Sequence, residues 1–185
     1  MAGLKGTNVK RIGHNDLEYL EKTLKETKDQ YQTRLVIIDG VYSQDGDLSL
    51  LPEIISLCKT HEAMLMLDDA HGIGVMGANG RGTAEHFNCL GQVDIITGTF
   101  SKSFGCVGGF AAASKKIIQY LKFYADSNVF SAAPTPQVTA SILKALEIIK
   151  KEPAIRARLW ENTDYLRSRL TTEGFDIGKS VSPIF

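Results

Sequence analysis

Short apolar segments alternate along the chain with longer segments whose apolar residues recur at helical spacing. The apolar segments, each of which predicts a strand, are residues 34–39, 63–71, 93–97 and 108–113. Helical spacing marks residues 14–29, 51–61, 114–125, 135–151 and 153–174. Because the strands are continuously apolar and interleaved with helices, the pattern predicts a three-layer α/β/α fold with a mainly parallel sheet covered on both faces.

Two features of the pattern mark boundaries. Asn15 is followed three residues later by Glu18, which resembles a capping box and predicts a helix start. The helical pattern stops near Gly174, and the sequence FDIGKSVSPIF then predicts the first strand of another unit. We therefore expect a large domain over residues 1–173 and the start of a second, truncated domain over residues 174–185.

Composition and charge narrow the class of protein. The 185 residues are 43% hydrophobic, which suffices for one good-sized core. Lysine and arginine number 21, as do aspartate and glutamate, so the basic excess of a nucleic-acid-binding protein is absent. No apolar run approaches the roughly 18 to 20 residues of a membrane span, and MAGLKGTNVKRIG lacks a signal-peptide core. We expect a soluble, cytoplasmic protein with reduced thiols at its three cysteines.

Polar, glycine-rich sequences follow the first three predicted strands. They read GVYSQDGD, DDAHGIG and GTFSKSFG. Ligands of parallel sheets bind beyond the carboxyl ends of the strands. If these strands are neighbours, five candidate residues converge on one edge of the sheet: Ser43, Asp68, His71, Thr99 and Lys102.

Two nucleotide-binding hypotheses can be tested against that edge. The sequence LMLDDAH is typical of a magnesium-binding strand end, but no phosphate loop accompanies it, since GKS at 178–180 has Glu173 where the first glycine belongs. Gly72, Gly74 and Gly77 match a dinucleotide fingerprint, with Asp94 about twenty residues on. The glycines do not open a helix, however, and Asp94 begins its strand rather than ending it.

A third hypothesis starts from Lys102, which stands among glycines and serines in GTFSKSFGCVGG. Such surroundings leave room for a carbonyl group to reach the amine and form a Schiff base. Pyridoxal phosphate needs a lysine for its aldehyde and a carboxylate at its ring nitrogen, which Lys102 and Asp68 can provide. His71 or Ser43 can meet the ring hydroxyl, and Thr99 can meet the phosphate.

These residues resemble a known family. DDAHGIGVMGANGRG followed by VDIITGTFSKSFGCVGGF is similar to the α-oxoamine synthases, which are fold-type I enzymes dependent on pyridoxal phosphate. HNDLEYLE and VYSQDGDLSLLPEI match the same family in the same order. The resemblance implies that the chain is the central part of the cofactor-binding large domain, incomplete at its N-terminus. Family members are longer at both ends, where they supply the ring-stacking residue and the arginine that binds the substrate carboxylate.

The resemblance also implies a role for each matched residue. Lys102 would hold the cofactor and move the substrate's α-proton, and Asp68 would pair with the ring nitrogen. His71, the second candidate catalytic residue, and Ser43 would lie near the ring hydroxyl, with Thr99 near the phosphate. Ser131, in FSAAP, would contact the phosphate across the interface of a homodimer.

The implied reaction is a decarboxylating Claisen-type condensation of an amino acid with an acyl-CoA. TFSKS and FSAAPTP are more similar to the serine palmitoyltransferase branch, which joins L-serine to palmitoyl-CoA and yields 3-oxosphinganine. The alternatives are another α-oxoamine synthase, which makes 8-amino-7-oxononanoate or acts as a glycine C-acetyltransferase, and a non-catalytic scaffold relative. We expect these 185 residues alone to lack turnover.

Overall fold

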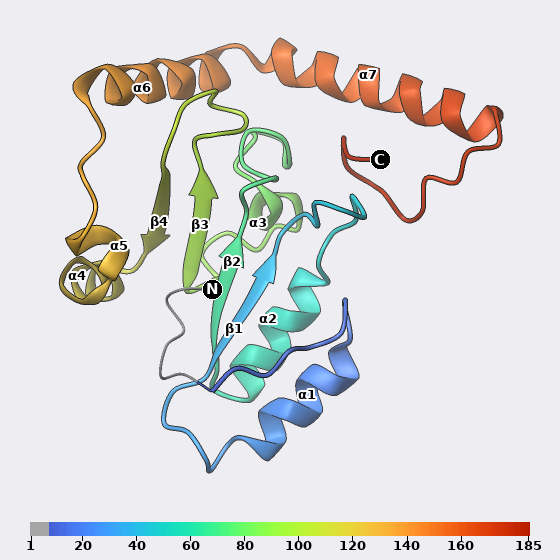
Figure 1. Cartoon of the computed structure of the whole chain (residues 1–185). Helices are drawn as coiled ribbons and strands as arrows, with labels where there is room; N and C mark the ends of the chain where they lie inside the picture. The colour runs from blue at the N-terminus through green and yellow to red at the C-terminus, as the bar shows by residue number, and fades with distance from the viewer. Residues whose placement is uncertain (1–7) are drawn as a thin grey trace.

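The computed structural model describes residues 8–185, so the first seven residues of the predicted large domain lie outside the described part. Its helices and strands follow one another in the predicted α/β order (Figure 1). They are α1 (Leu17–Glu26), β1 (Leu35–Asp39), α2 (Leu51–Thr60), β2 (Met64–Asp68), α3 (Thr83–His86), β3 (Ile95–Thr99), β4 (Gly109–Ala113), α4 (Lys115–Tyr124), α5 (Asp126–Val129), α6 (Pro136–Lys151) and α7 (Pro153–Thr172).

The four strands form one sheet in the order β1-β2-β3-β4. β1, β2 and β3 are parallel, and β4 is antiparallel to β3. The expected mainly parallel sheet is therefore confirmed. In the register, Asp39 is the partner of Asp68, and Asp68 is the partner of Thr97. Partners in register point to the same face, so these three side chains share one face at the carboxyl ends of the strands.

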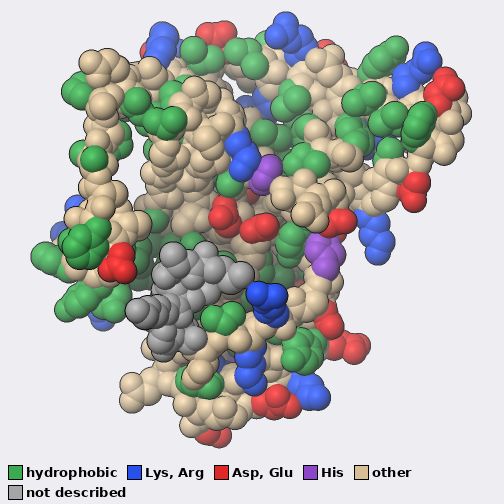
Figure 2. All heavy atoms as spheres, in the orientation of Figure 1, with side chains coloured by type: hydrophobic (Ala, Val, Ile, Leu, Met, Phe, Trp, Pro, Cys, Tyr) green, Lys and Arg blue, Asp and Glu red, His purple; other side chains and the backbone are tan. Residues whose placement is uncertain are grey.

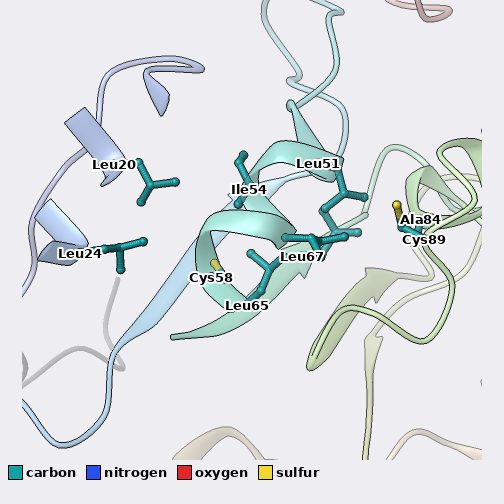
Figure 3. Packing of buried hydrophobic residues seen from close by; sticks show 10 residues of the cluster. Leu20, Leu24, Leu51, Ile54, Cys58, Leu65, Leu67, Ala84 and Cys89 are labelled. Carbon is teal, nitrogen blue, oxygen red and sulfur yellow. The ribbon is translucent and has the colours of Figure 1, made fainter. Parts of the chain in front are cut away.

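The hydrophobic core lies between the sheet and helices α1 and α2. Leu65 and Leu67 of β2 are almost completely buried, and they pack with Leu51 and Ile54 of α2. Leu20 and Leu24 of α1 extend this cluster on the far side of α2 (Figure 3). Burying one such leucine stabilises the fold by about 1.5–3 kcal/mol. The apolar residues that recur at helical spacing in α1 and α2 therefore stabilise this face of the sheet by packing against it.

The opposite face of the sheet is only thinly covered by the described residues. Leu35 and Ile37 of β1 are 45% and 50% exposed. The apolar runs predicted a sheet covered on both faces, and over β1 the described helices cover only the face that carries Leu65 and Leu67. Helices α6 and α7 instead run past the carboxyl ends of the parallel strands (Figure 1). None of the described helices combines the length and hydropathy needed to cross a membrane.

Two local expectations need correction, and two short helices were not foreseen. The cap of α1 is Asp16, whose carboxylate accepts the Tyr19 N–H, whereas Asn15 adopts a positive φ of 51° and bonds to the segment 48–50. The four-residue helices α3 and α5 were not predicted, because one turn is too short to show helical spacing.

Residues 174–185 do not form the expected strand. None of the four strands described in residues 8–185 pairs with this segment, so its backbone joins no ladder there. The segment lies instead against the turn after β1, where the Val181 N–H donates to the Gly46 carbonyl. It also contacts α7, because the Arg167 guanidinium donates to the Ser182 carbonyl at 3.2 Å. The division into domains at residue 173 stays a prediction.

Candidate functional site

Acidic and hydroxyl side chains end the parallel strands on the thinly covered face. Asp39 ends β1, Asp68 ends β2 and Thr99 ends β3. Because strand side chains alternate, Thr99 shares its face with Thr97, the partner of Asp68. Figure 2 shows acidic, basic and histidine side chains gathered just beyond the carboxyl ends of β1 and β2. This edge of the sheet is therefore the candidate site.

Asp68 and Asp69 are adjacent in the sequence but have different surroundings. Asp68 is partly exposed, and its Oδ1 accepts the Ala70 N–H at 3.1 Å, which fixes the direction of the carboxylate. Asp69 is 1% exposed and accepts two hydrogen bonds from Thr83, at 2.7 Å from the N–H and 2.6 Å from the hydroxyl. Asp69 thus anchors the following loop, and Asp68 remains available to a ligand.

Glycines surround the Asp69 carboxylate because side chains do not fit there. A Cβ at Gly72 or Gly82 would lie 1.9 Å from a carboxylate oxygen of Asp69. Gly72 of the dinucleotide-like motif therefore serves packing, and the first helix after the motif begins only at Thr83. Asp94, which stands where a dinucleotide fingerprint would need its ribose ligand, accepts the Leu65 N–H at 2.8 Å. The geometry rejects a dinucleotide site here.

Lys102 lies exposed in the loop that joins β3 to β4. The loop is held by backbone hydrogen bonds from the Phe100 N–H to the Gly108 carbonyl at 2.9 Å and from the Gly105 N–H to the Lys102 carbonyl at 2.9 Å. The Ser103 hydroxyl donates to the Ile73 carbonyl at 2.7 Å. This bond ties the lysine loop to the loop that carries His71.

Thr99 stands at the start of the same loop, and its hydroxyl group lies close to that of Ser101. Its Oγ1 accepts the Ser101 N–H at 3.1 Å and lies 2.7 Å from the Ser101 hydroxyl. Hydroxyl and backbone N–H groups in a turn suit an anionic group such as a phosphate. The expected phosphate contact of Thr99 nevertheless stays a prediction.

The charges of the candidate site influence one another. Burial lowers the pKa of His71, and the Lys102 ammonium lowers it further, whereas Asp39 and Asp68 act in the opposite direction. Burial raises the pKa of Asp39, and the neighbouring Asp68 adds to this. The charges of Asp39, Asp68 and Lys102 thus all act on His71. The roles expected of Asp68, His71 and Lys102 at a cofactor stay predictions.

Sequence reasoning missed Asp39. The only signal was the Asp-Gly pair that ends the first apolar run, which matches the position of Asp68 at the end of the second. Without the strand register, nothing showed that the two carboxyl groups are neighbours.

The remaining two predicted residues, Ser43 and Ser131, lie in other segments of the chain. Ser43 is exposed in the turn after β1, at the same edge of the sheet. Ser131 follows α5, and its hydroxyl donates to the Ser127 carbonyl. Ala113, at the end of β4, is the partner of Ile95 at the start of β3. Helix α4 begins just after Ala113, so α4 and α5 lie at the end of the sheet opposite the candidate site (Figure 1). Within one chain, Ser131 is not brought to Lys102, and its contact across a dimer stays a prediction.

Comparison with known proteins gives consistent matches. The chain matches the aminotransferase class I and II family over residues 1–185. The 8-amino-7-oxononanoate synthase of Thermoanaerobacter pseudethanolicus is 43% identical over 171 residues, which are 92% of this chain and 43% of that protein. The serine palmitoyltransferase of Sphingobacterium spiritivorum is 44% identical over 181 residues, 98% of this chain and 45% of that protein.

A solved structure of serine palmitoyltransferase from S. paucimobilis, with a bound PLP–myriocin aldimine, has the same fold. Its TM-score is 0.88 at 34% identity, and the match covers 94% of this chain and 45% of that one. The chain thus spans less than half the length of the curated relatives described above.

Proposed function

Because the chain belongs to the aminotransferase class I and II family, whose cofactor is pyridoxal phosphate, we propose that it is the cofactor-binding part of an α-oxoamine synthase. The observation that supports this proposal is that Asp68 ends a parallel strand on the thinly covered face, and that its charge and that of Lys102 both act on His71. The names of the relatives support the same class of reaction.

The residues present fit the cofactor. Asp68 has one carboxylate oxygen bonded to the Ala70 N–H, and among residues 8–185 the other oxygen has no hydrogen-bond partner. That oxygen can accept the ring N–H. Lys102 lies exposed on a loop fixed at both ends, so its amine is accessible to an aldehyde. The hydroxyl groups of Thr99 and Ser101, 2.7 Å apart, are the groups on this loop suited to a phosphate.

When bound, pyridoxal phosphate supplies an electron sink for negative charge at the substrate's Cα. Asp68 keeps the ring nitrogen protonated, since an anion beside it favours the charged form. Lys102 would hold the aldehyde of the cofactor, and its amine, when free, would carry the proton of the substrate's Cα. His71, whose protonation is influenced by Asp39, Asp68 and Lys102, would lie near the ring hydroxyl.

The finer proposal is that the whole protein condenses L-serine with palmitoyl-CoA, releasing CO₂ and CoA to give 3-oxosphinganine. The serine palmitoyltransferase relatives and the TFSKS sequence support this choice. The 8-amino-7-oxononanoate synthases match equally well, which makes that activity the second candidate. We also propose that the protein works as a homodimer, since Phe123 and Phe130 near Ser131 are 78% and 83% exposed.

A substrate panel separates these possibilities. The intact protein that carries these residues is incubated with glycine, alanine or serine, each with acetyl-, pimeloyl- or palmitoyl-CoA, and CoA release is measured. We expect the highest kcat/KM with serine and palmitoyl-CoA. A different preferred pair would contradict the palmitoyltransferase proposal, and no release with any pair, together with no bound cofactor, would leave only a scaffold role.

A further inference from the structure

The carboxyl group of Asp39 has no role in the mechanism proposed above, although it lies beside Asp68. The two residues are partners in the register of β1 and β2, each the last residue of its strand. Neighbouring strands are about 4.8 Å apart, and partners in register point to the same face. The Gly40 N–H donates to the Asp68 carbonyl at 2.8 Å, which holds the two strand ends together. The site therefore contains a pair of acids.

The charged and titratable groups that interact electrostatically with Asp39 come from several segments. They are Asp68 of β2, His71 of the loop after β2, Lys102 of the loop after β3 and Tyr42 of the segment after β1. His71 and Lys102 lower the pKa of Asp39, against the effects of burial and of Asp68. Two acids thus oppose two bases in one partly buried cluster.

Asp39 and Asp68 can have different roles because they interact with different groups. Asp68 has its charge balanced by the protonated ring once the cofactor is bound. Burial and Lys102 both disfavour the protonated form of His71, so that form needs a carboxylate that is not already engaged. Asp39 can be that carboxylate, because its charge favours the protonated form of His71 and it lies next to Asp68 on the same face of the sheet.

We infer that Asp39 is a positioning residue of the candidate site, whose carboxylate sets the charge of His71 while Asp68 serves the cofactor ring. This inference rests on the proposed function for the role of Asp68, but the coupling between Asp39 and His71 exists without the cofactor. An anion beside His71 keeps the imidazole able to gain and lose a proton near neutral pH. Replacing Asp39 therefore acts on the reaction through His71 rather than by direct contact with substrate.

The test is the titration of His71 in the intact, cofactor-free protein, followed by NMR of labelled histidine and assigned with His71→Gln. Asp39→Asn removes a favourable charge, so we expect the pKa of His71 to fall by about half a unit or more. Asp39→Glu restores the charge and should leave a pKa closer to the original. Asp45→Asn, which removes an exposed acid from the next turn, is the matched control and should have no effect.

An unchanged His71 titration in Asp39→Asn, or an equal shift in Asp45→Asn, would overturn the inference. Circular dichroism checks that each variant folds, and Asp39→Ser provides a second neutral variant with the same expected direction. Failure of the proposed function is a separate result, because a protein that binds no pyridoxal phosphate can still show the coupling. In the cofactor-loaded protein, Asp39→Asn should also shift the acidic limb of the pH–rate profile to lower pH, with Asp39→Glu restoring it.

Discussion

At the scale of single residues, strand geometry separates two adjacent acids into different roles. Asp68 is the last residue of β2 and lies on the thinly covered face, whereas Asp69 follows it on the buried side and bonds to Thr83. Burial raises the pKa of Asp69 to about 6, although the bonds from Thr83 act in the opposite direction. The buried acid therefore links stability to pH.

The first prediction concerns that link. The folded protein binds the Asp69 proton more tightly than the unfolded chain, whose aspartate has its ordinary pKa of 3.8. As pH rises through the window between these values, the unfolded state loses its proton first, so the free energy of unfolding falls, by about 2 kcal/mol. Asp69→Asn should remove this fall. Urea unfolding of the intact protein and the variant at pH 4, 5, 6 and 7 measures it, and a constant difference between the two across these pH values would contradict the prediction.

Residue identities could be predicted from sequence where a motif fixes the spacing. Asp68, His71 and Lys102 follow continuous apolar runs, and parallel strands bring such positions to one edge. Asp39 could not be predicted, because its partner depends on the strand register. The interpretation of Asn15 as part of a capping box is wrong for a similar reason. Its side chain forms hydrogen bonds with Leu48 and Leu50, which lie 33 and 35 positions further along the chain.

At the scale of elements, the long helices and all four strands agree with the sequence pattern to within a few residues. Their apolar periodicity reflects burial, which is the dominant driving force. The pattern could not show that residues 174–185 form no strand, because a strand needs a neighbour as well as an apolar sequence. It predicted helices on both faces of the sheet, whereas over β1 the described helices cover one face and leave Leu35 and Ile37 about half exposed.

A second prediction concerns the turn before α3. Gly82 has a φ of +95°, and a Cβ there would lie 1.9 Å from the Asp69 carboxylate. Gly91 has a similar φ of +79° but meets nothing within 4 Å. Gly91→Ala should therefore cost only the backbone strain of about 1 kcal/mol, whereas Gly82→Ala should cost several kcal/mol more. Thermal or urea unfolding of both variants compares them, and equal losses of stability would refute the packing role of Gly82.

A third prediction concerns the link between the two loops of the site. Ser103→Ala removes the hydrogen bond to the Ile73 carbonyl, which is worth about 1 kcal/mol and orders the Lys102 loop. We expect the dissociation constant for pyridoxal phosphate to rise roughly fivefold. Thr172→Ala, which removes an exposed hydroxyl bond to the Ser168 carbonyl on α7, is the control. The measurement is an absorbance titration of the intact apoprotein, and equal affinities in the parent and Ser103→Ala would rule out the link.

At the scale of the whole molecule, the described residues leave much apolar surface exposed. Leu35 and Ile37 on the sheet are about half exposed, and the aromatic side chains of α4 and the segment after α5 are more so. Exposed apolar patches of this kind mark surfaces that other protein covers. Together with a length below half that of its relatives, this surface supports the proposal that catalysis needs more than these residues.

A fourth prediction follows for the 185 residues expressed alone. They should bind a hydrophobic dye such as ANS strongly and give no detectable CoA release with any pair from the substrate panel, whereas the intact protein does. Dye fluorescence and the release assay are measured side by side at equal concentration. Synthase activity of the 185 residues comparable to that of the intact protein would contradict this prediction.

The most direct measurement of the central claim is chemical trapping of the cofactor. The intact protein is loaded with pyridoxal phosphate, treated with borohydride to reduce the carbon–nitrogen bond, digested and analysed by mass spectrometry. We expect the phosphopyridoxyl group on Lys102 and its loss in Lys102→Ala. Labelling of a different lysine, or equal labelling of parent and Lys102→Ala, would contradict the assignment of the site.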